Sequence, residues 1–474
     1  MKAADEFDRL VRGAGLYTGD RDRAGALHAA FVRSPHAHAR VRGIDLSAAL
    51  AAEGVVAILT GEDMAGLGAF PAIARHPLLP EGSLVAPHRP VLARERVRYV
   101  GEPVALVLAE TLSAAADGAE AVDVDYDTLP AVLAAVDAEG TPADVAIHAE
   151  APDNVAMDAV LGAGDRVEAA LSAAAHVVEV TVDLPRVMAN PMEPLGAVVA
   201  WDPAREGWDV FTPNQGTHEI QWPLSLVLGV PADRIRVHAT DVGGGFGARL
   251  PAYPEHAALL VAARRAGRPV AWQATRSENF QAEAPGRGNR LTGRLGVDPD
   301  GRFTALFITF EADLGAFVTP FGALIHVKNP AACPTGCYRI DQAAIRVVQR
   351  FSNTPPTGPY RGAGRPDVAL LIERLVDEAA RAIGRDRVAL RRLNVLGRDD
   401  MPWDSPLGGR YRDCDFVAVL EGALAASDVA GFPARREASA RAGRPRGGRL
   451  GRFVEVAGGG GGPRAAGRGG RCSA

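Results

Sequence analysis

The chain has 474 residues, which is enough for two or three domains of about 150 residues each. Apolar residues make up 47% of it and charged residues 23%, a globular composition that excludes a disordered or fibrous protein. The net charge of −5, from 52 basic and 57 acidic residues, does not indicate a binder of nucleic acid or of an anionic membrane.

Targeting and redox signals are weak. The first ten residues are polar, and no uninterrupted apolar run of about 18 residues occurs, so we expect a cytoplasmic protein without a membrane span. Four cysteines are too few for a disulfide framework or for an iron–sulfur cluster held by four thiolates of one region. Lysine occurs only at Lys2 and Lys328, so arginine-rich stretches reflect composition and are weak evidence of function.

Residues 1–136 alternate short β-type runs with helical patterns and are predicted to form one α/β domain. Strands are expected at residues 25–34, 40–45 and 55–61, and a strand–turn–strand at residues 97–109. Two helices are expected, one with its N-cap at Ser47 and one capped near Thr111 or Ser113. The polar residues 137–154 are predicted to be a linker.

Residues 155–400 are predicted to form a second, larger mixed domain, which makes the fold class α+β. Branched and aromatic residues predict strands at 176–184, 196–203, 208–214, 234–242, 268–275, 303–313 and 342–351. Helices are expected at 218–230, 255–267 and 366–384. In the last of these, apolar residues recur every three or four positions and Gly384 supplies the stop.

A glycine motif at residues 241–248, DVGGGFGA, follows a predicted strand and permits several interpretations. It matches the dinucleotide fingerprint, but Pro251 and Pro254 interrupt the helix entry and no acid ends the next strand. It could also be a turn that only lets a strand and a helix pack closely. A third interpretation is a backbone that approaches an oxygen-rich ligand through exposed N–H groups.

A second glycine loop at residues 354–366, TPPTGPYRGAGRP, leads into the strong helix. Arg361 and Arg365 could clamp an anion at the N-terminus of that helix, or they could simply be solvated. Two such loops, each next to a helix, favour one large anionic cofactor.

The two loops together resemble the molybdopterin-binding large subunit of the xanthine dehydrogenase, aldehyde oxidase and carbon monoxide dehydrogenase family of molybdenum hydroxylases. Further segments are similar to that family in order along the chain. They are residues 10–13 with Tyr17, then 27–40, 97–105, 124–130, 192–194, 214–215, 275–278, 313–316 and 390–394. The resemblance implies a hammerhead-like N-terminal domain (1–136), a first molybdopterin-binding domain (155–400) and the start of a second one (401–440).

The resemblance also implies roles for individual residues. Gln215 corresponds to a glutamine whose amide donates to an oxo group of the metal. The segment from Gly244 through Gly245 and Phe246 to Gly247 corresponds to backbone that lines the cofactor. Arg361 corresponds to a loop arginine near the metal, and the cofactor would be molybdopterin cytosine dinucleotide or a related molybdenum cofactor.

Other metal-type residues are expected to be structural. His36 and His38 form an H-x-H pair without a third ligand, and Cys333 and Cys337 are expected to pack. No metal ligand is therefore assigned to a side chain of this chain.

Departures from the family pattern bear on the substrate. Purine hydroxylases carry an acid where this chain has Leu250, and an aromatic residue where it has Ala363. Carbon monoxide dehydrogenase has a cysteine where this chain has Gly362. An aldehyde or an aromatic heterocycle is the expected substrate.

The family hydroxylates carbon with oxygen from water, using a glutamate as general base, and electrons leave through iron–sulfur clusters and flavin. The resemblance implies an iron–sulfur small subunit and an FAD-binding medium subunit as partners. The glutamate lies in the family's last third, so no catalytic residue is assigned here. The second cofactor domain is expected to be largely missing and the chain alone inactive.

The last segment, residues 441–474, has 12 glycines, 8 arginines and one acid, and is expected to be a disordered tail. Two alternatives to a hydroxylase subunit remain open. One is a non-enzymatic fragment that docks partner subunits, and the other is an NAD-dependent dehydrogenase.

Overall fold

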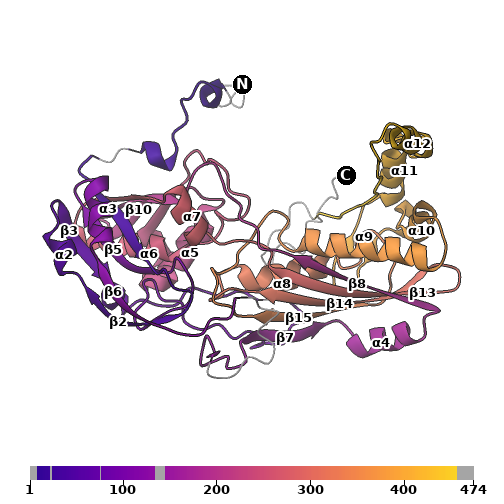
Figure 1. Ribbon diagram of the computed structural model, residues 1–474, viewed down its shortest axis with the longest axis horizontal. Helices are drawn as coiled ribbons and strands as arrows, with labels where there is room; N and C mark the ends of the chain where they lie inside the picture. The colour runs from indigo at the N-terminus through magenta and orange to yellow at the C-terminus, as the bar shows by residue number, and fades with distance from the viewer. Residues whose placement is uncertain (1–7, 22–23, 75, 134–144, 456–474) are drawn as a thin grey trace.

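The computed structural model describes residues 8–21, 24–74, 76–133 and 145–455, which form two lobes, each built on one large β-sheet (Figure 1). The mixed α+β fold is as predicted. One lobe carries a seven-stranded sheet and the other a five-stranded sheet. Two small sheets, of three strands and two strands, complete the described part of the chain.

The seven-stranded sheet combines strands from both halves of the sequence. Its order is β11 (Ile235–His238), β10 (Gly207–Phe211), β9 (Gly196–Asp202), β12 (Val270–Gln273), β1 (Leu27–Arg33), β5 (Pro103–Ala109) and β3 (Val55–Thr60). Strand β12 pairs with β9 on one side and with β1 on the other. The lobes therefore differ from the division predicted at residues 137–154, because strands that follow the predicted linker return to the N-terminal sheet.

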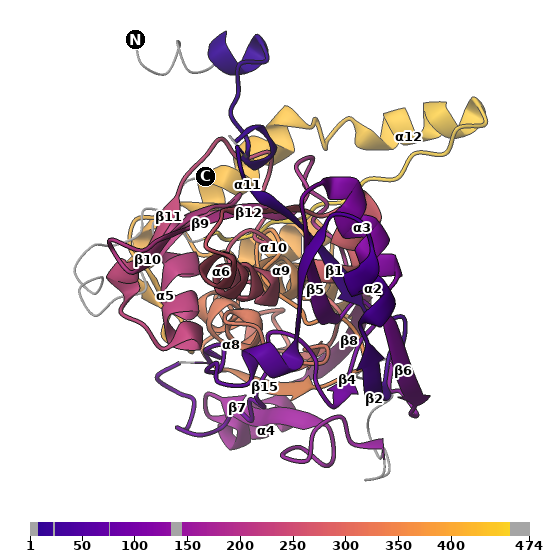
Figure 2. The ribbon, with the colours of Figure 1, turned by 90° about the vertical axis from the view of Figure 1, so that its left-hand side faces the viewer.

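Helices cover both faces of this sheet. On one side lie α5 (Thr217–Leu228), whose Ile220, Leu224 and Val227 are buried, and α6 (Pro254–Ala266), which is buried through most of its length. Helix α3 (Leu112–Glu120) packs on β1 and β5, and Figure 2 shows it on the opposite side from α5. Its predicted cap is confirmed, because the Thr111 side chain accepts from the Ala114 N–H at 3.1 Å.

The five-stranded sheet has the order β7 (Val155–Leu161), β15 (Ala343–Arg350), β14 (Phe303–Asp313), β13 (Asn289–Val297) and β8 (His176–Leu184). Helix α9 (Arg365–Ala382) lies along β8 and β13. All five of its predicted apolar positions are buried: Val368, Leu371, Leu375, Val376 and Ala379. Gly293 of β13 lets this helix pack closely on the sheet, because a Cβ at that position would lie 2.8 Å from the Leu375 side chain.

The remaining elements are short. The three-stranded sheet holds β4 (Arg96–Val97), β2 (Ala39–Asp45) and β6 (Asp123–Thr128), and the two-stranded one β16 (Trp403–Asp404) and β17 (Arg410–Tyr411). The other helices are α2 (Ser47–Ala51), α4 (Gly164–Ser172), α7 (Arg276–Ala282), α8 (Gly322–Ala332), α10 (Arg387–Asn394), α11 (Phe416–Ala426) and α12 (Phe432–Arg441). The cap predicted at Ser47 is one residue off, because Leu46 precedes the helix and Ser47 is its first residue.

Both segments predicted to be irregular contain packed residues. In the predicted linker, Ile147 and Asn154 are buried, and Ile147 N–H donates to the Asn154 side chain at 2.9 Å. In the predicted tail, Val454 is buried, and the Arg452 guanidinium lies 5.0 Å from the centre of the Tyr338 ring. The tail expectation thus fails for Arg452 and Val454, which pack on the five-stranded lobe, although Phe453 between them is exposed. Residues 137–144 and 456–474 lie outside the described residues.

None of the described helices combines the length and apolar character needed to cross a membrane.

Glu102, in the turn before β5, is a buried acid whose charge opposes folding. It is 3% exposed, and its Oε2 accepts from the Arg98 N–H at 2.5 Å. Burial raises the pKa of Glu102 to about 7, well above the ordinary range of a glutamic acid. An acid with a raised folded-state pKa contributes stability that falls as the pH rises from about 4.5 to about 7.

Glu102→Gln is therefore expected to raise the free energy of unfolding at pH 8 by up to about 3 kcal/mol, and to leave it almost unchanged at pH 4. Glutamine keeps an acceptor for Arg98 and removes the buried charge. Urea unfolding at both pH values measures the effect, with the exposed Glu95→Gln as control. Equal stabilisation at both pH values would contradict the raised pKa of Glu102 as its cause.

Candidate cofactor site

The two glycine loops, at residues 241–248 and 354–366, contact each other in the fold. The first loop joins β11 to α6, and the second joins β15 to α9. The Arg361 N–H donates to the Phe246 carbonyl at 2.9 Å. A Cβ on Gly247 would lie 2.5 Å from the Pro359 carbonyl oxygen, and Gly247 has a φ of +101°, so only glycine suits this contact.

Gln215, two residues before α5, is held by the first loop. Its Oε1 accepts from the N–H groups of Gly247 at 2.7 Å and Arg249 at 3.3 Å. A Cβ on Gly245 would lie 2.7 Å from this side chain, so the glycine leaves the space that the amide fills. Because the oxygen is taken by the loop, the Nε2 group is left with two N–H donors on an exposed residue.

A buried ion pair between Arg249 and Glu283 supports the C-terminal end of the first loop. Both side chains of the pair are fully inaccessible, and Arg249 also donates to the Glu193 carbonyl at 2.9 Å. Asn279 donates to the second oxygen of Glu283 at 2.7 Å. Burial raises the pKa of Glu283, and Arg249 opposes that rise.

The second loop is held by Arg287, which has a φ of +62°. It donates to the Arg361 carbonyl at 2.9 Å and pairs with Asp367 at 3.1 Å. Asn289 donates to the same carboxylate at 2.8 Å. Burial raises the pKa of Asp367, and Arg287 lowers it. The second loop is therefore tied to the first turn of α9.

The two arginines of the second loop differ in their surroundings. Arg361 is exposed, whereas Arg365 pairs with Glu455 at 3.0 Å. A groove of about 490 Å³ separates the loop and the start of α9 from residues 451–455. The hypothesis that both arginines clamp an anion is thus limited, since Arg365 already has a carboxylate partner.

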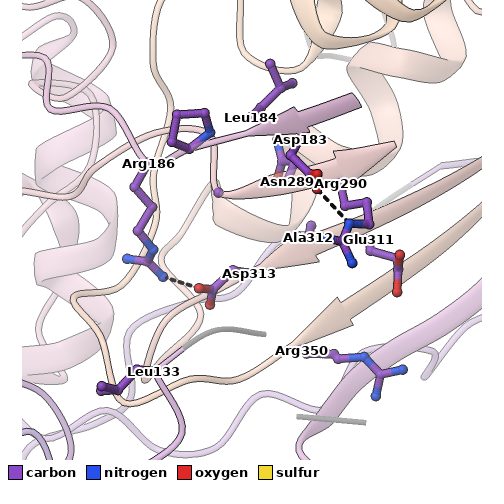
Figure 3. Close-up of a pocket in the computed structure, with 12 residues that line it drawn as sticks. Leu133, Asp183, Leu184, Arg186, Asn289, Arg290, Glu311, Ala312, Asp313 and Arg350 are labelled. Atoms are coloured by element: carbon purple, nitrogen blue, oxygen red, sulfur yellow. Dashed lines mark hydrogen bonds and ion pairs between the residues drawn. The ribbon is translucent and has the colours of Figure 1, made fainter. Parts of the chain in front are cut away.

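Another cavity, of about 320 Å³, lies beside the base of the second loop (Figure 3). Four of its charged side chains form two ion pairs: Arg186 bonds Asp313 at 2.9 Å, and Arg290 bonds Asp183 at 2.6 Å. Arg186 also donates to the Pro355 carbonyl at 2.6 Å. Arg186 therefore anchors the start of the second loop. The cavity itself lies apart from the contact between the loops.

The structure does not support a dinucleotide site at the first loop. The fingerprint requires a helix that opens within the glycine motif, whereas α6 begins only at Pro254. The other metal-type residues have structural surroundings. His38 bonds the Pro130 carbonyl at 2.6 Å, and burial raises the pKa of Cys333 to about 11 and of Cys337 to about 12.

Two acids near the loops are engaged by other groups. Glu193 accepts from the Gly243 N–H at 2.7 Å through one oxygen and from the Thr18 N–H at 3.1 Å through the other. Glu278 accepts from Arg33 at 2.8 Å and closes the first turn of α7. Glu193 therefore holds backbone in place, and Glu278 holds a buried arginine.

Sequence reasoning identified the residues that meet, but it did not identify the residues that support them. Arg249, Glu283 and Arg287 carry no spacing signal, because their partners lie in other segments. The predicted residues Gln215, Gly244, Gly245, Phe246, Gly247 and Arg361 do come together at one face. Phe246 is 45% exposed there, so a ligand can reach the loop backbone.

Family models match both parts of the chain. The model of the molybdopterin cofactor-binding domain matches residues 147–395, and that of the aldehyde oxidase and xanthine dehydrogenase a/b hammerhead domain matches residues 12–130.

Among curated relatives, the carbon monoxide dehydrogenase large chain of Hydrogenophaga pseudoflava is 34% identical over 92% of this chain and 55% of its own length. The nicotine 6-hydroxylase large subunit of Paenarthrobacter nicotinovorans is 33% identical, over 96% and 55%. The chain thus spans about half the length of these relatives.

Solved structures agree. Quinoline 2-oxidoreductase from Pseudomonas putida 86 superposes with a TM-score of 0.83 at 31% identity, covering 92% of this chain and 55% of that one. Carbon monoxide dehydrogenase from Oligotropha carboxidovorans gives 0.82 at 28%, with the same coverage. The chain belongs to the molybdopterin-binding large subunits of the aldehyde oxidase and xanthine dehydrogenase family of molybdenum-dependent oxidoreductases.

Proposed function

We propose that this chain supplies one side of the cofactor site of a molybdenum hydroxylase. The observation that carries the proposal is the contact between the two glycine loops, which brings Gln215, Phe246, Gly247 and Arg361 to one accessible face. The group to be held is molybdopterin cytosine dinucleotide or a related molybdenum cofactor.

The surroundings of Gln215 fit such a group. Its oxygen is occupied by the loop, so its free N–H donors suit an oxygen ligand of a metal. Gly244 and Gly245, which lack side chains, would let the pterin approach the loop backbone. When bound, the cofactor supplies the oxidising centre that inserts water-derived oxygen into a C–H bond.

The general base is proposed to come from polypeptide outside this chain. The two acids near the glycine loops, Glu193 and Glu278, are already committed to hydrogen bonds. Without a general base of its own, the chain alone is proposed not to turn over substrate, since the loss of a general base typically costs 10²–10⁴-fold in rate.

The proposed substrate is an aldehyde or an aromatic heterocycle. Leu250 and Ala363 stand where purine hydroxylases carry an acid and an aromatic residue. Gly362 has a φ of +87°, and a Cβ there would lie 2.3 Å from Pro366, so this backbone does not suit the cysteine of a carbon monoxide site.

The proposed partners are an iron–sulfur subunit and an FAD subunit. The names of the relatives support a multi-subunit assembly, since one relative is a subunit of the 6-hydroxypseudooxynicotine dehydrogenase complex. A chain that only docks these subunits remains a second candidate. Cofactor binding to the loops separates the two, because a docking fragment does not require it.

Gln215→Ala is expected to weaken binding of isolated molybdenum cofactor about tenfold, the cost of one hydrogen bond to a charged acceptor. Equilibrium dialysis with molybdenum analysis measures this, and hydrogen exchange shows whether residues 241–250 and 354–366 become protected. The control is Gln342→Ala, because Gln342 lies just before β15, at the end of that strand that is remote from the second loop. Absence of binding by the unaltered chain, or binding of NAD in its place, would refute the proposal.

A further inference from the structure

The N-terminal arm, residues 8–20, lies outside both large sheets, and its first turn of helix stands off the seven-stranded lobe (Figures 1 and 2). Two of its apolar side chains contribute little burial, because Val11 is 83% exposed and Leu16 53%, and Leu10 and Tyr17 are only half-buried. Hydrophobic packing therefore explains little of the position of the arm.

The arm is fastened to the first glycine loop through Asp241. Arg9 donates to both oxygens of this carboxylate at 2.7 Å, across 232 positions of sequence. The Leu16 N–H donates to the same carboxylate at 2.6 Å, and the Asp241 N–H donates back to the Leu16 carbonyl at 3.3 Å. These hydrogen bonds lower the pKa of Asp241 to about 2, so it stays ionised at any working pH.

A second fastening uses Glu193. Its carboxylate bridges the arm and the loop, because it accepts from the Thr18 N–H at 3.1 Å and from the Gly243 N–H at 2.7 Å. The Glu193 N–H donates to the Gly243 carbonyl at 3.1 Å. A Cβ on Gly243 would lie 2.4 Å from the Glu193 Cβ, so the approach requires glycine.

The first loop needs such external support. Gly244, Phe246 and Gly247 all have positive φ, and glycine backbone has more freedom to lose than any other residue. Gln215 and Arg249 hold the end of the loop. Asp241 and Glu193 hold its beginning, which leaves residues 244–246 between two fixed points.

We propose that the N-terminal arm is a strap that positions the first glycine loop for cofactor binding, with Arg9 and Glu193 as positioning residues. The cofactor part of this inference rests on the proposed function. The loop part does not, because the strap acts on the backbone of the chain before any ligand binds.

The test is hydrogen exchange on the chain without cofactor. Arg9→Ala is expected to speed amide exchange of residues 242–247 about tenfold, while exchange in α9 and the melting temperature stay unchanged. Arg9→Lys keeps the charge but loses the bidentate geometry, so it should restore part of the protection. Arg12→Ala is the matched control, because Arg12 pairs only with Asp8 inside the arm in the interactions described.

A second readout is the affinity for molybdenum cofactor by equilibrium dialysis. Arg9→Ala should weaken it severalfold, and Arg9→Lys less. Unchanged loop exchange in Arg9→Ala would overturn the strap, as would faster exchange spread evenly over the whole lobe. Faster loop exchange with unchanged cofactor affinity would overturn its role in binding. If the unaltered chain binds no cofactor, the proposed function fails, while the exchange result still decides whether the strap exists.

Discussion

Arg249→Met is expected to lower the free energy of unfolding by about 3–5 kcal/mol, because it leaves a buried carboxylate without its partner. Arg249 and Glu283 are both fully inaccessible, so water cannot solvate the remaining charge. The carbonyl of Glu193 also loses a donor. Urea unfolding at pH 8 measures the loss.

The pH dependence of this variant identifies the cause. Burial already raises the pKa of Glu283, and Arg249 is what counteracts it. Without Arg249, the carboxyl should take up a proton, so the deficit should be smaller at pH 5 than at pH 8. Arg249→Met with Glu283→Gln should recover much of the stability, because it removes the unpaired charge.

The control is Arg290→Met, whose pair with Asp183 is exposed and is expected to contribute less than about 1 kcal/mol. A deficit in Arg249→Met that does not change with pH, or that persists in the double variant, would show that lost packing volume matters more than charge.

Local structure could largely be predicted from the sequence, because it depends on neighbouring residues. The apolar spacing of α9 gave its length and its buried face, and Thr111 gave the start of α3. Strand partners could not be predicted in this way. Nothing in residues 268–275 indicates that β12 lies between β9 and β1, since pairing depends on distant segments, and β1 lies more than 200 positions away.

The candidate site shows the same limit. The glycine and proline content of the loops indicated two tight backbones, and the resemblance supplied Gln215 and Arg361. The loops contact each other through a backbone hydrogen bond from the Arg361 N–H to the Phe246 carbonyl. A pattern of side chains cannot predict a contact between backbone groups. Glu193 binds two backbone N–H groups that lie 175 and 50 positions away, and no local pattern in the sequence indicates this role.

Gly247→Ala is expected to have the largest effect on the site itself. A methyl group would lie 2.5 Å from the Pro359 carbonyl oxygen and 3.2 Å from the Tyr360 nitrogen, which are backbone atoms that cannot turn aside. The positive φ adds strain of about 1–3 kcal/mol. The loops should therefore separate, with loss of the hydrogen bond from Arg361 to Phe246 and of the one from Gly247 to Gln215.

The expected result is fast amide exchange at residues 360–362 and at least a tenfold loss of cofactor affinity, because the positions of Gln215 and Arg361 relative to each other are no longer fixed. Gly267→Ala separates strain from collision: Gly267 caps α6 with a φ of +62°, and nothing lies within 4 Å of its added Cβ. This control should lose a little stability and keep both loop protection and affinity. If Gly247→Ala behaves like Gly267→Ala, then the contact between the loops does not organise the site, and Gln215 must be positioned by α5 alone.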